Sequence, residues 1–415
     1  MASFFFGGLC GMGMAPLAAF LSEDNNRVLG FDDVEHKETK TYLEKFGVKF
    51  VDKNTSLKQF DKVVLSTALK KNTHQFLKNG ANAVQFRGEC WADICKKRRL
   101  AAIVGSHGKS TVSALVAHAI KKYNLKSGWL VGAIPNDFEM HRYCAEGEKI
   151  ISEIDESDGT IENFSPEITV ALNADLDHTD TYADWQALKE MFYRLFSRTK
   201  KYILFPETDI ILSEIASNFP QKAIPVKTSE NFVETNIAIA KKLVEVFLEC
   251  EVDNDAFSDY KGLLRRQEIL AKTPAFTAIA DYAHHPNEVK TFLQYFDKNF
   301  SDKKKIIVFQ PHRYTRTKQF ATNFAEIFDF YAQKNCKIIV APVYPASEPF
   351  DALGTAEKIA EKSKKMSIVL AKTEEIFKII EASILNDEKP AIAIVGAGDI
   401  YFEVKEFFKE NKWQK

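Results

Sequence analysis

The sequence predicts an α/β protein made of mostly parallel sheets, because strand-like and helical segments alternate along it. A β-branched apolar run, a turn and a segment of helical period follow one another at least five times. Alternation of this length gives parallel strands with helices on both faces of the sheet. Ligands of such sheets bind where the carboxyl ends of the strands meet loops. Residues directly after predicted strands are therefore the candidates for a functional site.

Length and charge narrow the possible classes of protein. With 415 residues, of which 45% are hydrophobic and 27% charged, the chain is globular and large enough for roughly two to four domains. Its 56 basic and 57 acidic side chains predict no long-range attraction to nucleic acid or to an anionic membrane. No apolar run approaches the roughly 20 residues of a membrane-spanning helix. The six cysteines are scattered without paired metal spacing, which favours a reducing cytoplasm.

The opening segment, MASFFFGGLCGMGMAPLAAFLSEDNN, can be interpreted as a secretory signal or as a buried strand with a glycine turn. A signal needs a positively charged start, and no Lys or Arg precedes Arg27. We therefore expect a strand at 4–6, a turn at 8–13 and a helix at 15–21. The amino end of that helix and the bare glycine backbone can approach a phosphate. The next segment, RVLGFDD, predicts a second strand that ends at Asp32.

The strongest local signal is IVGSHGKST, which lies between a predicted strand and an amphipathic helix. Gly105 and Gly108 let backbone N–H groups face a phosphate. Lys109 supplies positive charge there, and Ser110 or Thr111 can offer a hydroxyl to Mg²⁺. The spacing is shorter than in the usual GxxxxGKS/T motif. A glycine turn with a surface lysine is the alternative, but the flanking strand and helix favour a nucleoside triphosphate site.

Two acidic segments, SEIDESDGTIENF and VALNADLDHTDTY, lie at or just after the ends of later predicted strands. Their carboxylate, amide and imidazole groups could reach a phosphate-bound magnesium ion. The candidates are Asp155, Glu156, Asp158, Asn173, Asp177 and His178. Because Mg²⁺ keeps several waters, only one or two of them need touch the ion. A solvated loop is the alternative, and the neighbouring phosphate loop favours the metal site.

Two further segments, DYAHHPNEV and FQPHRYTRT, follow strands near the carboxyl terminus. Their histidines, arginines and tyrosines could hold a carboxylate, since an arginine fork matches it with two hydrogen bonds. His284 and His285 directly precede Pro286, which suits the first position of a helix, so helix capping is a competing role for one of them. Arg313 and Arg316 follow an apolar strand and must face a cleft or a partner.

The segments GSHGKST, EIDESD, NADLDHTDTY, DYAHHPNEV, FQPHRYTRT, VYPASE and GAGDI occur in the order typical of the Mur ligase family, which the chain resembles over nearly its whole length. The branch it resembles most joins L-alanine to UDP-N-acetylmuramate. The resemblance implies a Rossmann-like UDP-sugar domain at 1–98, a central P-loop ATPase domain with a mostly parallel sheet at 99–264, and a Rossmann-like amino-acid domain at 265–415. It also implies ATP and Mg²⁺ as cofactors, a cytoplasmic location, and a monomer or homodimer.

The implied activity is that of an ADP-forming carboxylate–amine ligase in peptidoglycan precursor synthesis. ATP would phosphorylate the lactyl carboxylate of UDP-N-acetylmuramate, and the amine of L-alanine would attack the acyl phosphate. Such catalysis is mainly positioning and electrostatics. The alternatives are a recycling ligase that adds a preformed peptide to the same sugar and a non-catalytic nucleotide-binding relative. The compact FQPHRYTRT loop favours a single alanine, and the intact Lys109, Glu156 and His178 favour catalysis.

The family motifs also imply residue roles. The expected catalytic residues are Lys109, Glu156 and His178, and the expected Mg²⁺ ligands are Ser110, Glu156 and His178. The expected ATP-binding residues are Gly105, Ser106, His107, Gly108, Lys109, Ser110, Thr111, Asn236 and Arg266. Those expected for the UDP-sugar are Gly8, Gly11, Gly13, Asp32 and Ser66. Those expected for alanine are Tyr282, His284, His312, Arg313 and Arg316.

The chain departs from the family pattern at several places. Cys10 stands at the inner glycine of the opening turn, and Val233 stands where the family has an adenine-contacting Asn, which leaves Asn236 of that motif. The central domain is shortened between Tyr202 and Asn236. The segment GAIPNDFEMHRYCAEGEK lacks the glycine-rich loop expected near the sugar nucleotide. We expect the phosphate contacts to follow the family more closely than the adenine and sugar contacts.

Overall fold

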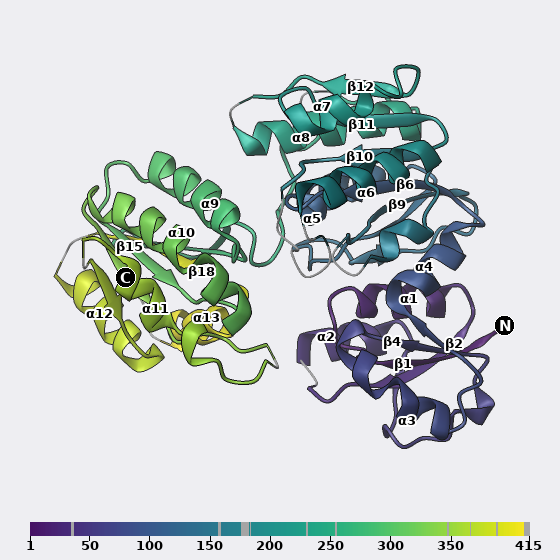
Figure 1. The fold of residues 1–415 in the computed structure, drawn as a ribbon, viewed down its shortest axis with the longest axis horizontal. Coiled ribbons are helices and arrows are strands. Elements are labelled where there is room, and N and C mark those ends of the chain that lie inside the picture. The colour runs from purple at the N-terminus through teal and green to yellow at the C-terminus, as the bar shows by residue number, and fades with distance from the viewer. Residues whose placement is uncertain are drawn as a thin grey trace. The chain divides into compact units, whose positions relative to one another are not determined.

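The computed structural model describes residues 1–34, 37–156, 159–175, 182, 184–229, 231–253, 255–346, 348–365, 367–386 and 389–410. The chain forms two compact units, Met1–Lys261 and Gly262–Lys415. The first unit contains two sheets and the second contains one, and nearly all strand pairs are parallel (Figure 1). The predicted α/β class with three mostly parallel sheets is confirmed. The domain boundaries near residues 98 and 264 remain predictions.

The first sheet is entirely parallel and has the order β3-β2-β1-β4-β5. Its strands are β1 (Ser3–Gly7), β2 (Arg27–Phe31), β3 (Lys49–Phe50), β4 (Lys62–Leu65) and β5 (Val84–Phe86). Its helices are α1 (Met14–Glu23), α2 (Lys37–Lys45), α3 (Thr73–Lys78) and α4 (Arg87–Cys95). The strand, turn and helix predicted for the opening segment are confirmed, and Phe5 and Phe6 are fully buried.

The second sheet has the order β12-β11-β10-β6-β9-β7-β8, with β8 antiparallel to β7. Its strands are β6 (Arg99–Val104), β7 (Ser127–Leu130), β8 (His141–Arg142), β9 (Lys149–Glu153), β10 (Ile168–Ala171), β11 (Tyr202–Pro206) and β12 (Ala223–Val226). Its helices are α5 (Lys109–Lys122), α6 (Trp185–Arg198), α7 (Ile210–Ala216) and α8 (Phe232–Leu243). Since β6 lies between β9 and β10, the acidic segments do follow the two strands that flank the phosphate-loop strand.

One hydrophobic core is shared by both sheets of the first unit. Phe20 of α1 packs edge-on against Trp91 of α4, with ring centroids 5.4 Å apart. The indole N–H of Trp91 donates a buried hydrogen bond of 3.0 Å to Ser152 Oγ on β9. Helix α4 therefore packs against elements of both sheets.

The second unit contains a sheet of order β13-β14-β18-β15-β16-β17, with only β13 antiparallel. Its strands are β13 (Glu268–Lys272), β14 (Thr277–Asp281), β15 (Lys305–Phe309), β16 (Cys336–Val340), β17 (Ile368–Leu370) and β18 (Ala391–Val395). Its helices are α9 (Pro286–Asn299), α10 (Tyr314–Ala332), α11 (Ala356–Lys362), α12 (Thr373–Leu385) and α13 (Ile400–Glu410). Separate apolar clusters fill the space on its two faces. No helix in the described part of the chain is long and apolar enough to cross a membrane.

Candidate active site

The phosphate loop connects β6 to α5. Gly105 and Gly108 adopt φ of +125° and +84°, a region that side-chain-bearing residues rarely enter. Gly108 precedes the first residue of α5, and no side chain caps that helix end. A loop of this shape directs backbone N–H groups and the positive end of the helix dipole toward a bound anion.

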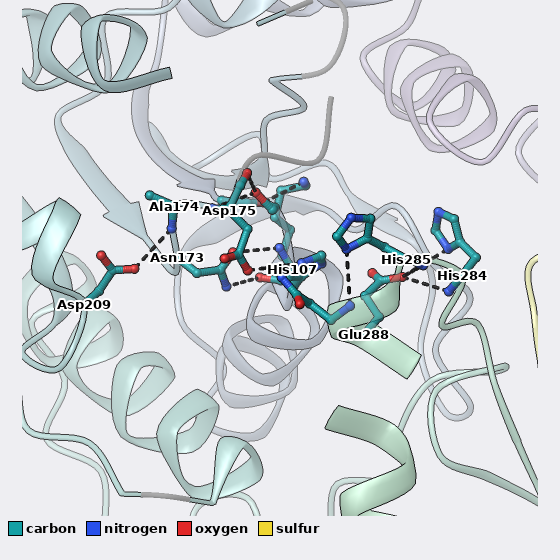
Figure 2. A network of polar contacts seen from close by, with 12 residues as sticks. His107, Asn173, Ala174, Asp175, Asp209, His284, His285 and Glu288 are labelled. Atoms are coloured by element: carbon teal, nitrogen blue, oxygen red, sulfur yellow. Dashed lines mark hydrogen bonds and ion pairs between the residues drawn. The ribbon is translucent and has the colours of Figure 1, made fainter. Parts of the chain in front are cut away.

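Asn173, which follows β10, fixes the shape of the phosphate loop. Its Oδ1 accepts the backbone N–H of His107 and its Nδ2 donates to the His107 carbonyl, both at 2.9 Å. Ser106 Oγ donates to the carbonyl of Asp175 at 2.8 Å, and His107 Nε2 lies 3.3 Å from Asp175 Oδ2 (Figure 2). Asn173 was a candidate metal ligand from sequence, and here its side-chain amide bonds to the loop backbone.

Lys109 pairs with Glu156 beneath the loop. Its Nζ lies 3.1 Å from Glu156 Oε2 and donates to the Gly105 carbonyl at 2.7 Å. The Glu156 residue is only 2% exposed. Burial works to lower the pKa of Lys109, but the charge of Glu156 and of the acidic groups nearby outweighs it, so the pKa is raised. Lys109 therefore stays charged where phosphate charge would be held.

Ser110 pairs with a different carboxylate, that of Glu153 at the end of β9. Ser110 Oγ donates to Glu153 Oε2 at 2.7 Å. Burial raises the pKa of Glu153, although the hydrogen bond from Ser110 and the charge of Lys109 work in the opposite direction. The sequence motifs group Ser110 with Glu156, and Glu153 was not among the predicted metal ligands. Glu153 is the acidic last residue of the strand that pairs with the phosphate-loop strand. Recognising it from sequence would have required knowledge of the strand order.

The remaining expected metal ligand, His178, lies outside the described residues, as do Asp158 and Asp177. Within the described ranges, no group of three His, Cys, Asp or Glu side chains has a metal-binding arrangement. Asn236 of α8 lies beside the loop, since a Cβ placed on Gly108 would be 3.4 Å from its Oδ1. The predicted ATP-binding residues 105–111 and Asn236 are therefore neighbours in the first unit.

The residues expected for the sugar nucleotide gather at the carboxyl ends of β1, β2 and β4. Gly8 has φ of +84°, and a Cβ there would lie 2.8 Å from Ser66 Cβ. Asp32 Oδ2 accepts the backbone N–H of Cys10 at 2.7 Å, and the N–H of Gly11 donates to the Gly8 carbonyl at 3.3 Å. Cys10 is 5% exposed, so its side chain packs into the interior. The turn thus accommodates a residue larger than glycine at this position.

In the second unit, His285 caps α9. Its Nδ1 accepts the backbone N–H of Asn287 at 3.4 Å, and Glu288 Oε2 accepts the N–H groups of His284 and His285 (Figure 2). The capping alternative therefore applies to His285. His284 Nδ1 lies 3.0 Å from the carbonyl of Tyr282 and 3.2 Å from Glu288 Oε2.

His312 stands at the centre of the residues expected for alanine. Its ring stacks on Tyr344 and lies 5.6 Å from the ring of His284. Burial, together with the positive charges of His284, Arg316 and Arg313, lowers the pKa of His312 to about 3, so the imidazole is neutral at ordinary pH. Arg316 Nη1 is 3.4 Å from His312 Nδ1. Arg313, with φ of +73°, is exposed at the start of α10.

These features define an α/β nucleotide-binding protein with a P-loop whose lysine and serine each face a carboxylate. The family model described as "Mur ligase middle domain" matches residues 103–256, and the one described as "Mur ligase, glutamate ligase domain" matches residues 265–398. The chain belongs to the Mur ligase family.

Relatives and solved structures match the chain along nearly its full length. The UDP-N-acetylmuramate–L-alanine ligase of Desulforapulum autotrophicum is 26% identical over 444 residues, covering 96% of each chain. The crystal structure of UDP-N-acetylmuramate–alanine ligase from Thermotoga maritima superposes with a TM-score of 0.79 at 22% identity and covers 100% of both chains. A murein peptide ligase from Psychrobacter arcticus superposes with a TM-score of 0.70 at 16% identity, covering 99% of this chain and 98% of its own. The two structures share the fold with this chain.

Proposed function

We propose that the chain is an ATP-dependent ligase that joins L-alanine to UDP-N-acetylmuramate through an acyl phosphate. The observation that carries the proposal is the phosphate loop, in which Lys109 pairs with one carboxylate and Ser110 with another. That loop belongs to a chain that aligns over 96% of its length with a relative named for this reaction. The transferred phosphoryl group needs positioning and charge neutralisation more than covalent chemistry.

Lys109 and the backbone of the phosphate loop would hold the phosphates of ATP. Ser110 Oγ and Glu153 are hard oxygen donors 2.7 Å apart, which is the kind of ligand that Mg²⁺ prefers. A magnesium ion held there would neutralise phosphate charge during transfer. Glu156, paired with Lys109, would keep the ammonium group pointing at the phosphates. His178 stays a proposed third ligand, and Asn236 and Arg266 stay proposed ATP contacts.

Alanine would bind where the strands of the second unit end. Arg313 and Arg316 would bind its carboxylate, because guanidinium groups match carboxylate geometry. A neutral His312 can accept a hydrogen bond from the amino group, which a charged imidazole could not do. Tyr282 and His284 would complete the pocket. In the first unit, Gly8, Gly11, Gly13, Asp32 and Ser66 would bind the sugar nucleotide.

The likeness to a murein peptide ligase keeps a preformed peptide as a second candidate for the amine substrate. The test is an amine panel with purified protein, ATP, Mg²⁺ and UDP-N-acetylmuramate, following phosphate release and ligated product. We expect release to require both the sugar nucleotide and L-alanine, and to be absent with the Lys109→Ala variant. Phosphate release that does not depend on the sugar nucleotide contradicts the proposal. Product that forms only with a peptide supports the second candidate.

A further inference from the structure

Arg87, the first residue of α4, lies against the glycine turn that follows β1. A Cβ placed on Gly13 would be 2.9 Å from Arg87 Cδ, 3.0 Å from its Nη1 and 3.1 Å from its Nε. Gly13 directly precedes α1, and no side chain caps that helix end. Any side chain at position 13 would displace the guanidinium group. The bare glycine therefore allows a cation to reach the turn, in addition to leaving its backbone accessible.

Helix α4 is held firmly in this position. A Cβ on Gly88 would lie 2.1 Å from Thr160 Oγ1, which shows that the helix start is pressed against the segment after β9. Trp91 Nε1 donates to Ser152 Oγ at 3.0 Å, and Ser152 is the residue before Glu153. The base of the Arg87 side chain is thus fixed relative to both the glycine turn and the strand that carries Glu153.

The charged end of Arg87 also has an acidic neighbour, Asp155. Its Nη2 lies 4.0 Å from Asp155 Oδ2, and the two side chains are 24% and 40% exposed. A pair this long and this exposed is weak, because water screens it. The charge of Arg87 also opposes the burial that raises the pKa of Glu153. The guanidinium group therefore lies between the glycine turn and the acidic loop.

We propose that Arg87 binds the diphosphate of the sugar nucleotide at Gly13. The inference rests on the proposed function, since it assigns a further residue to the same substrate. A guanidinium fork matches phosphate oxygens, and the amino end of α1 adds favourable partial charge at the same place. Asp155 competes with the diphosphate for this cation. The family motifs did not indicate the residue, because its role depends on where α4 lies in the folded chain.

The test compares Michaelis constants and UDP affinity in three variants. For Arg87→Met, which keeps an apolar stem, we expect the KM for UDP-N-acetylmuramate and the Kd for UDP to rise about 10- to 100-fold. The KM for ATP should stay within about threefold, because the phosphate loop is untouched. Arg87→Lys should be intermediate, since a point charge replaces the fork. Asp155→Asn should leave the Kd for UDP unchanged or lower it, because it removes the competing carboxylate.

Arg98→Met is the matched control. Arg98 follows the other end of α4, donates to the carbonyls of Cys144 and Gly147, and packs over Phe20 and Tyr143. Its loss should lower the Tm without selectively raising the KM for the sugar nucleotide. If Arg87→Met raises the constants for ATP and for UDP equally, or leaves UDP affinity unchanged, Arg87 does not bind the diphosphate. Absence of UDP binding and turnover in the unaltered protein would instead contradict the proposed function itself.

Discussion

The second sheet has a glutamate at its carboxyl edge, where the strands end, and another at its amino edge, where they begin. The pKa values of these two glutamates are shifted in opposite directions. At the carboxyl edge, Glu153 is half-buried with the Ser110 hydroxyl as its hydrogen-bond donor, and desolvation raises its pKa. At the amino edge, Glu167 is 8% exposed and accepts both Nε and Nη2 of Arg99, at 2.6 and 2.8 Å. Lys201 adds a second cation at 2.9 Å. The pKa of Glu167 is lowered to about 2, and the largest cause is its hydrogen bonding with Arg99.

This difference in pKa shift distinguishes a carboxylate that stabilises the fold from one that serves function, within a single sheet. The amino edge surrounds its carboxylate with cations, so the ionised form stabilises the fold. At the carboxyl edge, the hydrogen bond from Ser110 and the charges of Lys109 and Arg87 do not offset the desolvation of Glu153, which costs free energy unless a further cation binds there. Three substitutions and one titration test this contrast.

The largest expected effect is on Lys109→Ala. Turnover should fall on the order of 10³-fold or more, because the charge that holds the phosphates is gone. The free energy of unfolding should also fall by about 2 kcal/mol, since Glu156 is left buried with its charge uncompensated. Phosphate release and urea unfolding measure the two effects. Lys201→Ala removes a lysine from the amino edge instead and should leave turnover unchanged; comparable losses in both variants would erase the contrast.

Glu153→Gln should lower turnover without lowering stability. We expect turnover to fall about 100-fold at fixed Mg²⁺ and to recover partly as Mg²⁺ is raised, because a metal ligand has lost its charge. Stability should be unchanged or slightly higher, since a partly desolvated carboxylate has been replaced by a neutral group. Titration of Mg²⁺ against initial rate, with thermal unfolding alongside, gives both readings. Normal Mg²⁺ dependence would remove Glu153 from the metal site.

Glu167→Gln should do the reverse of Glu153→Gln. Turnover should stay within about twofold, while the free energy of unfolding at pH 7 should fall by about 2 kcal/mol. Because the folded-state pKa lies below the ordinary value, the stabilisation is present above about pH 4.5 and is lost as the pH falls toward 2. Unfolding curves of the two proteins should therefore differ at pH 7 and converge near pH 2. A difference that does not depend on pH would argue against the ion pairs as its cause.

The smallest effect concerns His312, which extends the contrast to the second unit. Its pKa of about 3 means that the imidazole does not titrate between pH 5 and 8. The ring C–H resonances of His312, assigned by comparison with His312→Gln, should hold constant chemical shifts across that range. A midpoint near 6.5 would show that the ring is solvated, as an exposed histidine would be.

The sequence alone supplied the parts of the site that depend on local geometry. The phosphate loop, the opening strand with its glycine turn and the helix start at Pro286 each lie within one short segment, where spacing and residue type fix the backbone. Glu153, the loop-binding role of Asn173, and Arg87 escaped that reasoning. Each of these acts on a segment distant in sequence, through the order of β9, β6 and β10 or through the packing of α4.

The contrast between Glu153 and Glu167 shows which properties the local sequence does not determine. Both are acidic residues at a strand terminus or just before a strand, and their local sequences do not reveal which pKa rises and which falls. Only the folded chain brings Arg99 and Lys201 around Glu167 and packs Glu153 against Ser110 and Gly132. Sequence determined the fold class, the family and the loop that holds phosphate. Tertiary structure decided the electrostatics, because burial and charge at a carboxylate depend on groups from other strands.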